Sequence, residues 1–129
     1  MATSLPVLKE PMNLGDLLKY EAPNLYSRDR VTVGAGQTLR LGAVLGMVTE
    51  TGKVKQIDPS ATDGTQYAAG VLMQDADAHL ADRHDGLMVA RHAIVAEHAL
   101  QWPVGMAAAE QQAAILQLKA LGVLVRTSA

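Results

Sequence analysis

The chain has 129 residues, 49% of them apolar, with 11 Lys and Arg against 13 Asp and Glu and no cysteine. This length predicts one self-supporting domain, the missing cysteines exclude disulfides and thiolate zinc sites, and the net charge of −2 argues against a nucleic acid partner. No stretch has the pattern of a signal peptide or of a membrane span, so a soluble, unsecreted chain without a membrane partner is expected.

Residues 1–30 differ from the rest and are predicted to form an N-terminal arm. Three prolines interrupt any regular element there, and only a helical turn over 15–20, capped by Asn13, fits between them. Large apolar side chains recur every few residues, which is costly in water, so the arm is expected to lie on a partner protein or, alternatively, on its own domain as a lid. The candidates for this contact are Leu5, Val7, Leu8, Leu14, Leu17, Leu18, Tyr20 and Tyr26.

Residues 31–129 are predicted to form a β-rich domain, because short apolar runs there alternate with glycines and turn residues. The continuous apolar run over 43–48 is typical of a strand covered on both faces. Gly52 lies in a turn composition that predicts a hairpin. Further strands are expected at 31–33, 39–41, 54–57, 68–73, 87–90, 93–96 and 123–125. The polar stretch 74–86 is interpreted as a mobile surface loop.

One long helix is predicted over about 106–121, with Gly122 as its C-terminal cap. A branched apolar face is expected to pack on the core. A second, smoother face is formed by Ala109, Ala113, Leu116 and Ala120. This face could admit a neighbouring chain and is a possible trimer interface; alternatively it is simply solvated, because alanine is the best helix former.

The sequence contains none of the familiar catalytic signatures, so no enzyme activity, cofactor or metal is expected. One cluster combines imidazoles and carboxylates that could in principle bind a divalent cation: Asp75, Asp77, His79, Asp82, His84 and Asp85. Its spacing departs from a calcium loop at the sixth position, Leu80, and at the twelfth, Gly86. A small metal-dependent enzyme is therefore the weaker alternative to a solvated loop.

Four stretches of the chain, taken in order and spacing, resemble the head decoration proteins of lambda-like tailed bacteriophages. They span nearly the whole chain: 15–21 with 26–28, 35–39 with 41–46 and 51–53, 63–64 with 69–72, and 100–103 with the helix and 121–126. No single stretch is diagnostic, since each is a glycine turn or an apolar run.

The resemblance implies a capsid decoration protein, made in the host cytoplasm and located in the virion on the outer surface of the capsid. It implies a homotrimer bound to the major capsid protein at threefold and quasi-threefold points, which stabilises the expanded head against internal DNA pressure. The implied fold is a bent ribbon of the β-clip type, with an arm that adds a strand to the capsid protein. This arm is longer than in the shortest members, and the loop 74–86 is unusually rich in Asp and His. A cytoplasmic adaptor that binds a sheet edge of another protein is the alternative of a different class.

Overall fold

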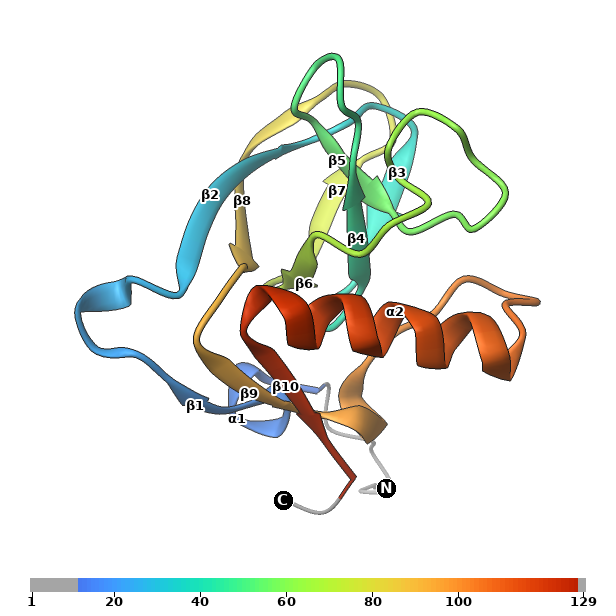
Figure 1. Cartoon of the computed structure of the whole chain (residues 1–129). Helices are drawn as coiled ribbons and strands as arrows, with labels where there is room; N and C mark the ends of the chain where they lie inside the picture. Colours follow the sequence, from blue (N-terminus) through green and yellow to red (C-terminus); the bar gives the residue numbers. More distant parts are fainter. Residues whose placement is uncertain (1–11, 128–129) are drawn as a thin grey trace, which may run out of the picture.

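The computed structural model describes residues 12–127, which fold into a mainly β structure with one long helix (Figure 1). The elements are α1 (Leu14–Leu17), β1 (Leu18–Glu21), η1 (Pro23–Leu25), β2 (Arg28–Val33), β3 (Gln37–Leu39), β4 (Val44–Met47), β5 (Val54–Gln56), β6 (Gly70–Leu72), β7 (Ala76–Ala78), β8 (Arg83–Val89), β9 (Ala93–Ala96), η2 (Glu97–Ala99), α2 (Ala108–Leu121) and β10 (Val123–Arg126). The prediction of a mainly β fold with a helix near the C-terminus is confirmed.

Five of these strands close into a small barrel in the order β2-β5-β4-β6-β8. The longest pairing is the antiparallel one between β2 and β8, which both bend along their length (Figure 1). The short ribbon of β3 and β7 lies beside the barrel. Closure leaves the barrel without a free strand edge, so its backbone groups are paired within the molecule.

Strands β4 and β6 of the barrel are largely buried on both faces, which explains their continuous apolar runs, whereas β2, β5 and β8 also carry exposed or half-buried polar residues. In β4, Val44 points to one cluster of buried side chains and Leu45 to another. The cluster inside the barrel also holds Val33, Val54 and Met88. The prediction of a doubly covered strand over 43–48 is thus confirmed for its first part, while Met47 is 37% exposed.

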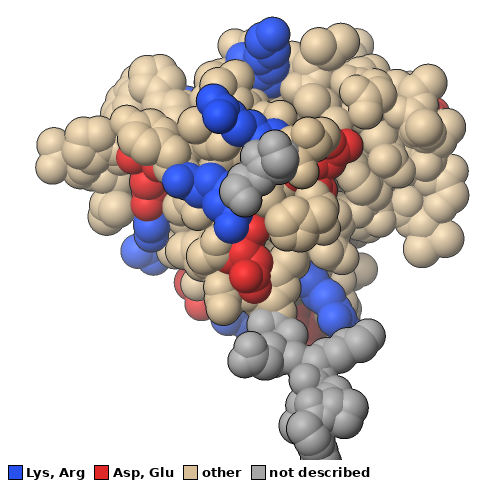
Figure 2. Space-filling model, turned by 90° about the horizontal axis from the view of Figure 1, so that it is seen from below, with Lys and Arg blue, Asp and Glu red and all other residues tan. Residues whose placement is uncertain are grey.

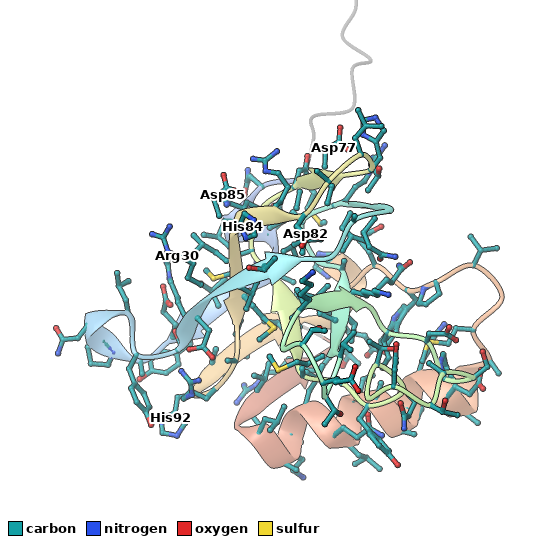
Figure 3. All side chains as sticks on the ribbon, turned by 90° about the horizontal axis from the view of Figure 1, so that it is seen from above. Arg30, Asp77, Asp82, His84, Asp85 and His92 are labelled. Atoms are coloured by element: carbon teal, nitrogen blue, oxygen red, sulfur yellow. The ribbon has the colours of Figure 1, made fainter. Side chains whose placement is uncertain are left out.

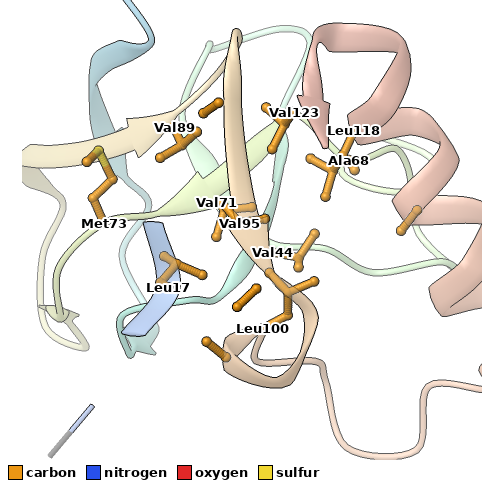
Figure 4. Close-up of a cluster of buried hydrophobic side chains, with 14 of the residues drawn as sticks. Leu17, Val44, Ala68, Val71, Met73, Val89, Val95, Leu100, Leu118 and Val123 are labelled. Carbon is orange, nitrogen blue, oxygen red and sulfur yellow. The ribbon is translucent and has the colours of Figure 1, made fainter. Parts of the chain in front are cut away.

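The second half of the molecule is a three-stranded sheet in the order β1-β9-β10, which lies below the barrel in Figure 1. Strand β1 is antiparallel to β9, and β10 is parallel to it. One buried cluster joins this half to the barrel: Leu17 of α1, Val95 of β9 and Leu118 of α2 meet Val44 and Val71 of the barrel there (Figure 4).

Helix α2 begins two residues later than predicted and ends where predicted. At its start, the Glu110 carboxylate accepts a hydrogen bond from the Ala107 amide at 3.0 Å. At its end, Gly122 has φ 95°, and its amide donates to the carbonyls of Leu118 and Lys119. A left-handed residue at this position is typically glycine, because a Cβ atom there is strained.

Two predictions about chain organisation differ from the structure. Residues 12–30 belong to the folded domain rather than to an arm, because β1 pairs with β9 and β2 is a strand of the barrel. The stretch 74–86 is no mobile loop: it forms β7 and the start of β8, and its alternation buries Ala76 and Ala78 while Asp77 faces solvent. In both cases the segment is a strand because it forms hydrogen bonds with strands that are distant in the sequence, and local sequence patterns do not show such pairing.

Candidate interaction surfaces

The outward side of α2 carries a strip of apolar side chains next to polar ones. Ala114 and Leu118 point into the core, and on the opposite side of the helix Leu116 is 65% exposed. Its exposed neighbours on that side are Ala109, Ala113 and Ala120. Gln112 and Lys119 are exposed on the other flank of Leu116, so the apolar strip borders the polar side chains that surface helices usually carry. We call these four residues the helix face.

A second uncovered apolar surface is the outer side of the sheet β1-β9-β10. Tyr20, Ile94 and Leu124 lie directly beside one another, one on each strand, because Ile94 is the register partner of both others. They line a hollow of about 320 Å³ together with Ala22, His92, Ala93 and Gly122. Tyr20 is 56% exposed and Leu124 is 38% exposed. We call the row Tyr20–Ile94–Leu124 and its hollow the sheet face.

The chain reversal between β1 and β2 presents further apolar side chains next to the sheet face. Leu25 has φ 59° and is exposed. The Tyr26 ring meets the His92 ring edge-on at 5.1 Å between centroids. The Arg91 guanidinium lies 5.3 Å from the centre of the Tyr26 ring, donates to the Tyr26 carbonyl and is paired with Asp29 at 2.7 Å. Bonding to Asp29 raises the pKa of Arg91. The reversal is thus fixed to the connection between β8 and β9 by directed contacts.

A second ion pair fixes β1 to the start of β2. Arg28 donates to both carboxylate oxygens of Glu21, at 2.9 Å from Nε and 2.5 Å from Nη2, and the buried Ser27 hydroxyl donates to the same carboxylate at 2.6 Å. These hydrogen bonds, that from Arg28 above all, lower the pKa of Glu21 below its usual value, although partial burial opposes the shift. The pair holds β1 in the folded domain.

The residues predicted for an arm fall into three groups. Leu17 is fully buried in the core of this chain, and Leu14 and Leu18 are partly buried against that core, so these three support the fold. Tyr20 and Tyr26 are each 56% exposed. Leu5, Val7 and Leu8 lie outside the described residues.

Asp77, Asp82 and Asp85, which are labelled in Figure 3, each form a separate ion pair, whereas Asp75 accepts a hydrogen bond from the Leu41 amide and His84 contacts the Thr32 hydroxyl. His79 Nδ1 lies 2.6 Å from Asp77, Lys53 lies 2.7 Å from Asp82, and Arg83 lies 2.9 Å from Asp85. Each of these partners lowers the pKa of its carboxyl group. Within residues 12–127 no three His, Asp or Glu side chains are grouped closely enough to hold a metal ion.

Charge is unequal between the two halves. The barrel segment, residues 29–89, carries eight Asp and Glu against five Lys and Arg, whereas the remaining described residues carry four against five. Figure 2 looks at the end opposite the barrel loops: charges of both signs lie close together in its middle, and a broad uncharged surface extends to the right, where α2 and the loop before it lie in Figure 1.

These features define a class: a small β protein whose distinctive surfaces are apolar faces suited to contact with other proteins. The chain belongs to the family described as bacteriophage lambda head decoration protein D, whose sequence model matches residues 7–123. No curated protein matches it. Among residues 12–127 there is no helix of the length and apolarity needed to span a bilayer. The chain is accordingly a viral structural protein located on the outside of the phage capsid, and the resemblance seen in its motifs is confirmed.

Proposed function

We propose that this protein binds the outside of the expanded phage head as a homotrimer, at threefold and quasi-threefold positions, and strengthens the shell against the pressure of the packaged DNA. The single observation that carries this proposal is the family match over residues 7–123. The partner is the major capsid protein. No catalytic step is part of the proposed function, in keeping with a structural family.

The helix face is proposed as one surface of the trimer contact. It is the outward side of the only long helix among the described residues, and Leu116 at its centre is well exposed in the single chain. Covering such a side chain contributes roughly 1 to 2 kcal/mol per subunit by the area it removes from water. The alanines around it allow a neighbour to approach closely.

Residues 1–11 are proposed as the capsid-binding arm, with Leu5, Val7 and Leu8 as its apolar contacts. The segment joins the fold at Met12, which packs on the core beside Leu14. Strand addition to the capsid protein would use backbone hydrogen bonds, with alternate side chains in shallow pockets. Three such arms per trimer would act together, since docking of the first raises the effective concentration of the others.

The orientation on the shell follows from the charges and the chain start. We propose that the acidic barrel faces outward and that the end carrying α1 faces the capsid. Two observations support this: the barrel segment holds the excess of carboxylates, and α1, at the start of the described chain, lies at the opposite end (Figure 1). The β-clip type of fold is likewise a proposal, supported by the long bent pair β2 and β8.

Electron microscopy of expanded capsids mixed with purified protein tests the proposal. Wild-type protein is expected to give density at threefold positions, and the deletion of residues 1–11 is expected to abolish it while leaving a folded trimer. A matched control is Leu80→Ser, an exposed barrel-side residue whose change should leave occupancy intact. Full decoration by the deletion variant would disprove the role of the arm, and absence of any wild-type density would disprove the function.

A further inference from the structure

We propose that the helix face of one subunit packs on the sheet face of the next, with Leu116 seated in the hollow between Tyr20, Ile94 and Leu124. This inference rests on the proposed trimer and names the two surfaces that build it. Only one of them, the helix face, is suggested by the amino-acid sequence; the sheet face exists because three distant strands come together.

Threefold symmetry is the first argument. A closed ring of three subunits uses heterologous contacts, in which one surface of each subunit meets a different surface of its neighbour. Isologous pairing of the helix face with its own copy requires a twofold axis, which a ring of three does not have. The trimer therefore needs a second, complementary surface, and the sheet face is an apolar concave one within the described part of the chain.

Shape is the second argument. The helix face is smooth except at Leu116, because its other members are alanines. The sheet face is hollow, about 320 Å³, and its walls are mostly apolar side chains together with the glycine that follows α2. A protruding leucine with alanines along one flank is a shape that enters such a hollow while the alanines contact its rim, and Gln112 and Lys119 on the other flank then lie at the border of the contact.

The polarity of both faces is the third argument. Strand β9 is paired on both sides, with β1 and with β10, so covering the middle of the sheet leaves no backbone group without a partner. No charged side chain belongs to the four residues of the helix face or to the row Tyr20–Ile94–Leu124, and the exposed Lys119 beside Leu116 can keep its ammonium group in water at the border of the contact. The Tyr20 hydroxyl is on an exposed side chain at the edge strand and can keep its water.

The two faces are also placed as a ring requires. Helix α2 is joined to β10 through Gly122, and Figure 3 shows α2 and His92, which lines the hollow, along the same side of the molecule. A subunit in a ring of three is a wedge whose two contact surfaces converge on the axis, so they must be neighbours rather than lie at opposite ends.

Cysteine pairing provides a direct test, because the natural chain contains no cysteine. The double variant Leu116→Cys with Tyr20→Cys places one thiol on each face. Tyr20 lies on β1, across β9 from the strand that follows the helix, which disfavours a link within one chain. Treatment of the purified protein with a short bismaleimide is expected to give covalent dimers and trimers on a denaturing gel.

Each single variant is expected to stay monomeric on that gel, since a heterologous contact does not bring two copies of one residue together. The matched control is Leu116→Cys with Leu80→Cys, because Leu80 is 85% exposed but lies outside both faces, between β7 and β8. Covalent dimers of Leu116→Cys alone, or equal linking in the control pair, would overturn the proposed contact.

Light scattering separates the two levels of the proposal. If the unmodified protein is a monomer, the trimer and this contact both fail. If it is a trimer whose Leu116 and Tyr20 cysteines do not link, the trimer stands and the contact between the two faces is wrong.

As a second readout, Leu116→Asp is expected to give a folded monomer at concentrations where wild type is a trimer, whereas Leu80→Asp stays trimeric. A trimeric Leu116→Asp protein would also overturn the contact.

Discussion

The barrel and the three-stranded sheet solve the problem of free strand edges differently. The barrel closes on itself, and its strands β4 and β6 are largely covered on both faces by side chains of this chain. The sheet β1-β9-β10 is open at β1 and β10 among the described residues, and one of its sides carries an uncovered apolar row. Closed sheets resist association, and open apolar ones favour it. The barrel is thus the half whose strands are paired within this chain, and the sheet with α2 is the half whose exposed apolar surface favours binding to a partner.

The first prediction concerns the buried contacts that join the barrel to the sheet half. Leu17→Ala removes a fully buried side chain from the cluster that joins α1 and the sheet to the barrel. We expect a loss of about 2–5 kcal/mol in the free energy of unfolding, measured by urea denaturation. The control Leu80→Ala, at an 85% exposed position, should change it little. If Leu17→Ala left the stability unchanged but abolished capsid binding, Leu17 would be a capsid-binding residue of the arm, as the sequence predicted, and not a core residue.

The second prediction compares two glycines with nearly the same backbone angle. Gly36 has φ 92° with nothing within 4 Å of an added Cβ, while Gly42 has φ 95° and an added Cβ would lie 2.2 Å from the Ala99 carbonyl oxygen. Gly36→Ala is expected to cost only the left-handed strain, about 1–2 kcal/mol. Gly42→Ala also forces η2 away from the barrel, so its cost is expected to be clearly larger.

Thermal and urea unfolding of the two alanine variants give the comparison directly. Gly42 adjoins β4, and Ala99 ends η2 in the sheet half, so their close approach is part of the junction between the halves. Equal losses of stability in both variants would mean that the junction can move apart without cost, and that the two halves are less tightly joined than the buried cluster indicates.

The sequence predicted the elements whose signal is local. Gly122 marked the end of α2, and the hairpin at Gly52 joins β4 to β5. Asn13 did cap a helical turn, but the turn spans Leu14–Leu17, whereas the predicted range 15–20 runs into strand β1. The capping of α1 is local in the same way, since the side chains of Asn13 and Asp16 bond each other's backbone amides. Such features depend on residues three or four positions apart and can be read without the fold.

What the sequence did not reveal depends on distant pairing. Leu17, in a proline-rich segment, was assigned to an arm because nothing nearby shows that Val95 and Leu118 cover it. The sheet face was missed for the same reason, since Tyr20, Ile94 and Leu124 lie far apart in the chain. One weaker signal was present: the alternation Ala76-Asp77-Ala78, typical of a strand.

The smallest expected effect concerns the ion pair that holds β1 to β2. Glu21→Gln keeps a hydrogen-bond acceptor for Ser27 and Arg28 but removes the charge. Because both side chains are partly buried, 19% and 26% exposed, we expect a loss of about 1 kcal/mol at pH 7. The barrel offers a control in Glu50→Gln, since Glu50 is an exposed residue of the β4–β5 turn that forms no ion pair with another described residue, and this change should have little effect.

The dependence on pH has a definite sign. The pKa of Glu21 is lowered in the folded state, chiefly by the hydrogen bonds from Arg28, so the unfolded chain takes up the proton first as pH falls. The stabilisation is therefore complete above the ordinary glutamate pKa of about 4.3 and is lost as pH drops through the folded value. The stability difference between wild type and Glu21→Gln should accordingly be constant from pH 7 to about 5 and shrink below that. A difference that grows towards acid pH would show that the carboxylate opposes folding, and that β1 is held to β2 by packing alone.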